Sequence, residues 1–300
     1  LIPLTLDYKK GFTIHFHKKI QDTYTINYTT TFNNEWKIDK TKPDFWNKAS
    51  ITWLYNGTTQ TAEAEARLWP DNMTQQNGAK SGSYNASSKQ IIWDIKANYN
   101  RKTLNHAEIR DTLLQGQKLV PNSVKVYDMT LHGWWNGVQK GAEVPSSQYT
   151  LVLPSAANNN ELNIQFNQSI NSPYWVTFQT TLEGELIDKE INNNALLMDG
   201  KNVDSEWTAK VTVPHGGEYV TKSGAQNGNK IDWNIHINEG QSHVSNAKIV
   251  DTPSNNQILI EDSFHLYSTK VSANGEAVKD TELVKDQDYM LKITTTAQGE

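Results

Sequence analysis

Apolar and polar residues alternate at every second position along much of the chain, which is the pattern of a strand with one buried face. Turn-forming pairs separate the alternating runs at the spacing of hairpins. No segment sustains a helical apolar stripe over three turns. The pattern therefore predicts an all-β fold. The clearest runs are Ile91–Ala97 and Trp207–Val213, and the clearest turns are Asn56-Gly57, Asn136-Gly137, Asp199-Gly200 and Asn274-Gly275.

Two segments are ambiguous between helix and strand. Thr61–Trp69 is rich in Ala and Glu, which favour helices, but its strict alternation favours a strand. For Leu113–Lys118 we expect one short helix.

The alternating runs recur along the chain. Twelve residues between Ile91 and Tyr127 reappear 140 positions later without a gap. A second alignment, with an offset of 150, carries the run Phe12–Tyr28 onto Leu162–Phe178. Together they describe a unit of about 145 residues, which indicates tandem copies of one fold. The first matched set is Ile91, Trp93, Ile95, Asn98, Ala107, Ile109, Asp111, Thr112, Gln117, Leu119, Ser123 and Tyr127.

The repeat predicts three parts: residues 1–70 as the C-terminal part of one unit, 71–214 as a complete unit, and 215–300 as the N-terminal part of the next. A cut near Asn33 and Glu183 would give a unit of similar length. Short strands with regular turns and no crossover helices favour tandem β-sandwiches of the immunoglobulin-like, Greek-key type. We therefore expect one complete and two partial repeats.

Composition narrows the class of protein. The net charge is -5 and the basic residues are scattered, so nucleic acid is not expected as a partner. No apolar run approaches the roughly 18 residues that span a bilayer, and no signal or anchor is recognisable. Cys is absent, which excludes disulfides and thiolate metal sites. Ten Trp, twelve Tyr and seven Phe predict an aromatic core.

Three polar positions recur among the otherwise apolar shared residues. Lys80, beside Ser81-Gly82, has a counterpart in Lys222. Asp111 has one in Asp251, and Asn193, ahead of Ala195, has one in Asn47. A shared core accounts for the apolar positions but not for these. The alternative interpretation is purely structural: Asp111 caps a turn, and Lys80 is a solvated surface residue.

These positions carry a family resemblance. A lysine before a Trp-bearing strand, an Ile-x-Asp-Thr strand, a Tyr-rich strand and a following Asn-x-Ala resemble the collagen-binding-type domains of Gram-positive surface adhesins. The Tyr-rich strand stands at Tyr24–Thr30 and, more loosely, at Tyr174–Thr180. The resemblance covers essentially the whole chain, and its order recurs in three partial copies.

The resemblance implies a spontaneous isopeptide bond in the middle unit. Lys80 would be the nucleophile, Asn193 the electrophile and Asp111 the proton shuttle. Burial would favour a neutral amine and a protonated acid, the forms that such a reaction needs. Asn192, Asn194 and Lys89 lie close by in the sequence and stay open as alternatives. Asn47, Lys222 and Asp251 would be the equivalent partial sites.

Other candidate sites are weaker. Trp134 and Trp135 could form a ligand-binding platform, although such a pair more often covers a hairpin. His15 and His17 share a strand face, but the aligned Gln165 and Asn167 are not metal ligands, so we expect no metal. No phosphate loop, nucleophile elbow or dinucleotide fingerprint appears. We expect no cofactor and no activity on external substrates.

The resemblance therefore predicts a non-enzymatic, extracellular adhesin attached to a Gram-positive cell wall. The segment would be stalk or ligand-binding repeat region, with a host matrix protein or glycan as partner and neighbouring repeats beside it. The alternative is a carbohydrate-binding β-sandwich region of a secreted polysaccharide-active enzyme.

Overall fold

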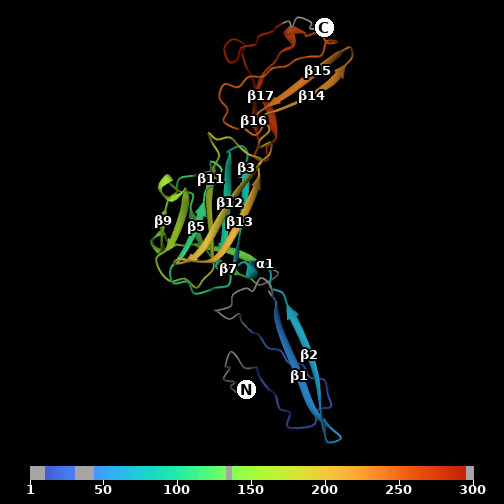
Figure 1. Cartoon of the computed structure of the whole chain (residues 1–300), viewed down its shortest axis with the longest axis vertical. Coiled ribbons are helices and arrows are strands. Elements are labelled where there is room, and N and C mark those ends of the chain that lie inside the picture. Colours follow the sequence, from blue (N-terminus) through green and yellow to red (C-terminus); the bar gives the residue numbers. More distant parts are fainter. Residues whose placement is uncertain (1–10, 31–43, 133–136, 295–300) are drawn as a thin grey trace. The chain divides into compact units, whose positions relative to one another are not determined.

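The computed structural model describes residues 11–30, 44–132 and 137–294. It divides into two units, residues 1–33 and residues 34–300. Almost all regular structure in the described residues is β-strand (Figure 1). The exceptions are α1 (Asn72–Gln75) and the 3-10 turns η1 (Ser146–Gln148), η2 (Ala156–Asn158) and η3 (Glu261–Ser263).

Two antiparallel sheets form a β-sandwich in the middle of the chain, from cyan to orange in Figure 1. The first sheet has the strand order β13-β12-β5-β10-β9. Strands β9 and β10 form one hairpin and strands β12 and β13 form another. Strand β5 comes earlier in the chain and pairs with β10 on one side and β12 on the other. The strands are β5 (Ala107–Thr112), β9 (Tyr149–Val152), β10 (Glu161–Phe166), β12 (Glu190–Asp199) and β13 (Asn202–Thr212).

The second sheet has the order β3-β4-β11-β7-β8, and the short β6 also pairs with β11. The chain thus crosses between the sheets several times, which gives the sandwich its immunoglobulin-like character. The strands are β3 (Gly78–Asn85), β4 (Gln90–Ala97), β6 (Lys118–Leu119), β7 (Lys125–Leu131), β8 (Val138–Glu143) and β11 (Tyr174–Thr181).

The core lies between the inner faces of these sheets, as period-2 alternation requires. Trp93 of β4 and Phe178 of β11 are opposite each other in the ladder, and both are fully buried. Gly82 of β3 makes room for the indole, because a Cβ there would lie 2.4 Å from the Trp93 ring and 2.6 Å from Val211. The predicted all-β sandwich is therefore confirmed for these residues, but its core is mostly aliphatic and includes only Trp93, Tyr149, Phe178 and Trp207 as buried aromatic residues, so the expected aromatic core is wrong.

The predicted helix at Leu113–Lys118 is wrong. Gln115 and Gly116 have positive φ angles of 53° and 72°, so the chain turns instead of continuing a helix. The Gln117 side chain donates a hydrogen bond to the Leu114 carbonyl across this turn. The short helix α1 lies elsewhere and is capped by Asp71, whose carboxylate accepts a hydrogen bond from the Thr74 amide.

The described residues contain three further hairpins outside the sandwich. The strand expected at Thr61–Trp69 is confirmed as part of the first hairpin. In the second, Lys222 lies opposite Ile235, just as Lys80 lies opposite Ile95 in the sandwich. The hairpins are β1 (Phe45–Tyr55) with β2 (Thr58–Leu68), β14 (Val220–Asn227) with β15 (Lys230–Ile237), and β16 (Tyr267–Val271) with β17 (Ala277–Glu282).

The described residues of the first unit, 11–30, contain no strand. Their aligned counterparts at 161–180 form β10 and most of β11. Two ring contacts are nevertheless present, Phe12 with Tyr28 at 4.9 Å and Phe16 with Tyr24 at 5.4 Å between centroids. The second matches the contact of Phe166 with Tyr174 at 4.7 Å in the sandwich.

Candidate functional site

An amine and a carboxylic acid meet inside the sandwich. Lys80 projects from β3 in one sheet, and Asp111 projects from β5 in the other. The Lys80 Nζ donates a hydrogen bond to Asp111 Oδ2. The two side chains are 0% and 1% exposed, so the pair is sealed from water. Lys80 is therefore not a solvated surface residue.

Asn193 occupies the same interior face as Asp111. Ala195 of β12 lies opposite Asp111 of β5, and Asn193 stands two positions before Ala195 on the same side of the strand. Asn193 is completely buried. Neither polar atom of its amide has a hydrogen-bond partner of normal geometry, and Asp111 Oδ1 also has none. Buried polar atoms without partners are rare in folded proteins, so this cluster needs an explanation.

Burial controls the protonation of the pair. Desolvation lowers the pKa of the Lys80 amine, although the nearby Asp111 opposes that shift. Desolvation likewise raises the pKa of the Asp111 carboxyl, against the opposing effect of Lys80 and a smaller one of Asn193. Both shifts favour the neutral forms. The site thus holds a potential nucleophile, a potential acid and an unpaired amide.

Aromatic rings and a second polar group surround the amine. The Lys80 Nζ lies 5.2 Å from the Trp93 ring centre and 5.1 Å from that of Phe178. The Trp93 Nε1 donates to Gln117 Oε1 and to Thr180 Oγ1, at 3.0 Å each. This polar cluster holds the indole in place beside the amine.

Sequence reasoning missed the role of Gln117 and Thr180. Gln117 is fully buried, and its Nε2 donates to the carbonyl oxygens of Leu114 and Asn192. The sequence does contain a signal for the role of Gln117, because this residue recurs as Gln257 in the repeat. A glutamine that recurs together with a tryptophan indicates a partner for the indole N–H.

The alternative residues lie outside the cluster. Asn192 is exposed, and Asn194 donates from Nδ2 to Glu206 Oε1 on the outer face. Lys89 pairs with Glu183 at 3.0 Å. Alternation along β12 explains the choice, because Asn193 points inward and its two neighbours point outward.

The partial sites repeat the same contacts. Lys222 Nζ lies 2.5 Å from Asp251 Oδ1 and 4.7 Å from the centre of the Trp233 ring. The Trp233 Nε1 donates to Gln257 Oε1 at 3.2 Å. Unlike the pair in the sandwich, the Lys222 and Asp251 side chains are 35% and 45% exposed. Asn47 lies on β1 opposite Ala66, as Asn193 lies opposite Ala209.

The remaining predicted positions are an aromatic pair and a histidine pair. Trp134 and Trp135 lie outside the described residues. The described residues, which include His15 and His17, contain no group of three or more His, Cys, Asp or Glu that could hold a metal. No helix among them is both long and apolar enough to cross a membrane.

Comparison with models of protein families shows to which family this chain belongs. The model of the collagen binding domain matches residues 75–208 and again 217–299, which together exceed half of the chain. The chain belongs to this family. The two matches begin near the start of β3 and of β14, so they follow the repeat. Comparison with curated proteins gave no match.

Solved structures of collagen-binding domains match parts of this chain at low sequence identity. The collagen-binding subdomain of the Enterococcus faecalis surface protein ACE is 14% identical, with a TM-score of 0.33, over 45% of this chain and 95% of its own. The collagen-binding domain of a Staphylococcus aureus adhesin is 16% identical, with a TM-score of 0.32, over 45% of this chain and 96% of its own.

Proposed function

We propose that this chain is part of an extracellular, non-enzymatic adhesin of a Gram-positive bacterium, whose middle repeat carries an isopeptide bond between Lys80 and Asn193. The observation that carries the proposal is the sealed Lys80–Asp111 pair on the same interior face as the unpaired amide of Asn193. Membership of the collagen-binding-domain family supports the adhesin class.

The bond would form without an external reagent. The neutral Lys80 Nζ attacks the Asn193 Cγ, and the Asp111 acid donates a hydrogen bond to the amide. As the Nζ–Cγ bond forms and the Cγ–Nδ2 bond breaks, Asp111 passes the amine proton to the departing nitrogen, and one ammonia leaves. Because packing holds all three groups in place, the reaction needs no encounter between separate molecules. Desolvation by burial disfavours the charged amine, which cannot attack.

The crosslink suits a protein under mechanical load. β3 lies at the edge of one sheet and β12 in the other, so a Lys80–Asn193 bond closes a loop of more than a hundred residues. Such a link lowers the conformational entropy of the unfolded chain. In the loop-closure model this raises the free energy of unfolding by about 4–5 kcal/mol. It also prevents pulling from opening the sandwich fully, in a chain without Cys.

The test of the bond is the intact mass of the whole chain in a Lys222→Met background, where the second site cannot react. We expect a mass lower than the sequence mass by one ammonia. Lys80→Met, Asp111→Asn and Asn193→Ala should each restore the full mass, whereas Asn194→Ala should not. A full-length mass without any loss in the parent would contradict the proposal.

For the partner we propose a host extracellular-matrix protein, with collagen as the first candidate because of the family to which the chain belongs. Binding of the chain to immobilised triple-helical collagen, with heat-denatured collagen as the matched control, tests this. Selective binding to the triple helix would support a ligand-binding role. Equal or absent binding would contradict collagen as the ligand of these repeats.

A further inference from the structure

The turn that follows β5 takes the place of a strand beside β12. Strand β5 pairs with β12 as far as Thr112, which lies opposite Asn194. The chain then turns away from β12, since the Leu113 amide donates a hydrogen bond to the Asn160 carbonyl just before β10. The β5 ladder therefore does not reach the backbone of Asn192.

Two glutamine side chains of this turn supply hydrogen bonds to β12 in place of a strand. Gln115 Oε1 accepts from the Asn192 amide at 2.7 Å, and Gln115 Nε2 donates to the Glu190 carbonyl at 3.1 Å. Gln117 Nε2 donates to the Asn192 carbonyl at 3.1 Å. Because Asn193 is the next residue, these bonds hold the part of β12 that carries the buried amide.

Gln117 also connects β12 to the aromatic wall beside the amine. Its Oε1 accepts from the Trp93 Nε1 at 3.0 Å and from the Thr180 hydroxyl at 3.1 Å. The centre of the Trp93 ring lies 5.2 Å from the Lys80 Nζ. One side chain thus binds the strand of the electrophile through Nε2 and the indole beside the nucleophile through Oε1.

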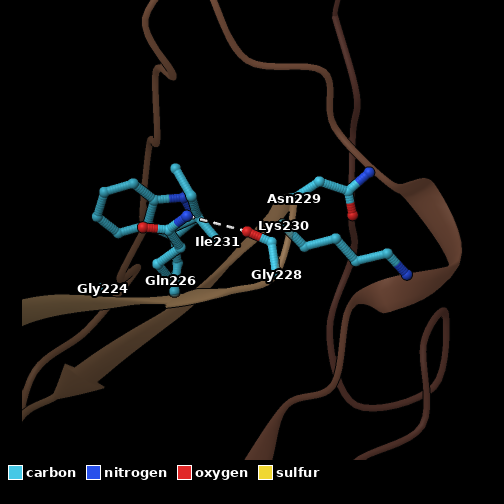
Figure 2. A pocket seen from close by; sticks show the side chains of 7 residues that line it. Gly224, Gln226, Gly228, Asn229, Lys230 and Ile231 are labelled. Carbon is cyan, nitrogen blue, oxygen red and sulfur yellow. Dashed lines mark hydrogen bonds between the residues drawn. The ribbon is translucent and has the colours of Figure 1, made fainter.

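The same glutamine contact recurs beside an open hollow. Gln257, the counterpart of Gln117, accepts from the Trp233 Nε1 at 3.2 Å, and in both residues Nε2 donates to the residue three positions earlier. Trp233 is 48% exposed and lines the hollow together with Gly224 and Ile231 (Figure 2). Because the contact is present where packing does not enclose the indole, the turn itself places the glutamine.

We propose that Gln115 and Gln117 are positioning residues for the crosslink, which hold β12 so that the Asn193 Cγ faces the Lys80 Nζ. The inference rests on the proposed function, because it concerns the same reaction. Both residues act through β12 and Trp93 rather than by contact with the reacting atoms. A misplacement of about 1 Å can slow a reaction about 100-fold. Loss of either glutamine should therefore slow bond formation without changing its product.

The test is the rate at which newly made chain loses ammonia, followed by intact mass in the Lys222→Met background after cell-free synthesis is stopped. Gln115→Met removes both hydrogen-bonding groups of that side chain and should slow the loss by about 10- to 100-fold. Gln115→Glu keeps an oxygen that accepts from the Asn192 amide, so it should lose ammonia about as fast as the parent. Because Gln115 is exposed, neither change should unfold the sandwich.

Gln117 has a matched control in Thr180. Gln117→Leu and Thr180→Val each remove one acceptor of the Trp93 N–H, but only the first removes the donor to the Asn192 carbonyl. Gln117→Leu should therefore slow the loss of ammonia by about 10- to 100-fold, and more than Thr180→Val does. Equal slowing by the two variants would overturn the role given to the Asn192 carbonyl.

Hydrogen exchange reports on β12 without the reaction. In the Asn193→Ala chain, which cannot form the bond, Gln115→Met should speed exchange of the Asn192 amide, whereas Gln115→Glu should not. Faster exchange in both variants, or in neither, would overturn the inference.

The outcomes separate this inference from the proposed function. If the parent loses ammonia and both Gln115→Met and Gln117→Leu lose it equally fast, the inference is overturned and the proposed function stands. Equal slowing by Gln115→Met and Gln115→Glu would also overturn it, because the bond to the Asn192 amide would then not be the cause. A parent that keeps its full mass would overturn both.

Discussion

Asp111 lies opposite Ala195 in the antiparallel pairing of β5 and β12. Because side chains on one face repeat every second residue, this register aims Asn193 into the interior, two positions from Ala195. A slip of one residue would turn Asn193 to solvent and point Asn192 or Asn194 inward in its place, so the register decides which of the three asparagines meets Asp111. The chemistry of the site therefore depends on strand register.

Removal of the amide should destabilise the sandwich far more than removal of its neighbour. Asn193→Ala abolishes the crosslink, so the free energy of unfolding should fall by about 4–5 kcal/mol. Asn194→Ala is the matched control, since that side chain bonds Glu206 at the surface and should cost less than about 1 kcal/mol. Thermal unfolding measures both, and equal melting temperatures would contradict a crosslink at Asn193.

In the Asp111→Asn variant, the free energy of unfolding should increase as the solution becomes more alkaline. Without the bond and without the acid, desolvation lowers the pKa of Lys80 below its ordinary 10.5, against the weaker attraction of Asp94. Between the lowered pKa and 10.5 the unfolded chain binds more protons than the folded one, so the free energy of unfolding should rise as the pH increases toward 10.5. Denaturant titrations at several pH values measure this. The double variant with Lys80→Met should lose that rise; if it retains it, the amine is not the cause.

The hydrogen bonds of Gln117 should contribute measurably to stability. Gln117→Leu removes one of the two acceptors of the buried Trp93 N–H and the side-chain donor to the carbonyls of Leu114 and Asn192, although Leu114 keeps the backbone N–H of residue 117. The loss of these buried hydrogen bonds should cost about 1–3 kcal/mol in total. The exposed Gln148→Leu provides the control. A loss no larger than that of the control, in urea unfolding, would contradict the role given to Gln117.

Tyr84 should make the domain sensitive to strong alkali. Burial, assisted by the charge of Glu183, raises its pKa from 10.0 to about 12. Between these values the unfolded chain has lost a proton that the folded chain retains, so stability falls as pH rises. Its buried hydroxyl oxygen also has no hydrogen-bond partner. Tyr84→Phe should therefore weaken the loss of stability between pH 10 and 12, and an unchanged slope in that range would contradict the shift.

Much of this could be predicted from periodicity and repetition. Alternation predicted the strands β2, β4 and β13, and recurrence indicated Lys80, Asp111 and Asn193 as special. The turn at Leu113–Lys118 could not be predicted, because Gln115 and Gln117 favour helices by propensity but are held by tertiary hydrogen bonds. Likewise, residues 24–30 have a strand pattern but form no strand, since a strand needs a neighbour for its backbone groups.

The central claim is a covalent bond between two named side chains, and peptide mapping of the digested chain tests it most directly. The account predicts one branched peptide in which fragmentation joins Lys80 Nζ to Asn193 Cγ, with the loss of one ammonia. Recovery of separate linear peptides that contain an unmodified Lys80 and an unmodified Asn193 would contradict it.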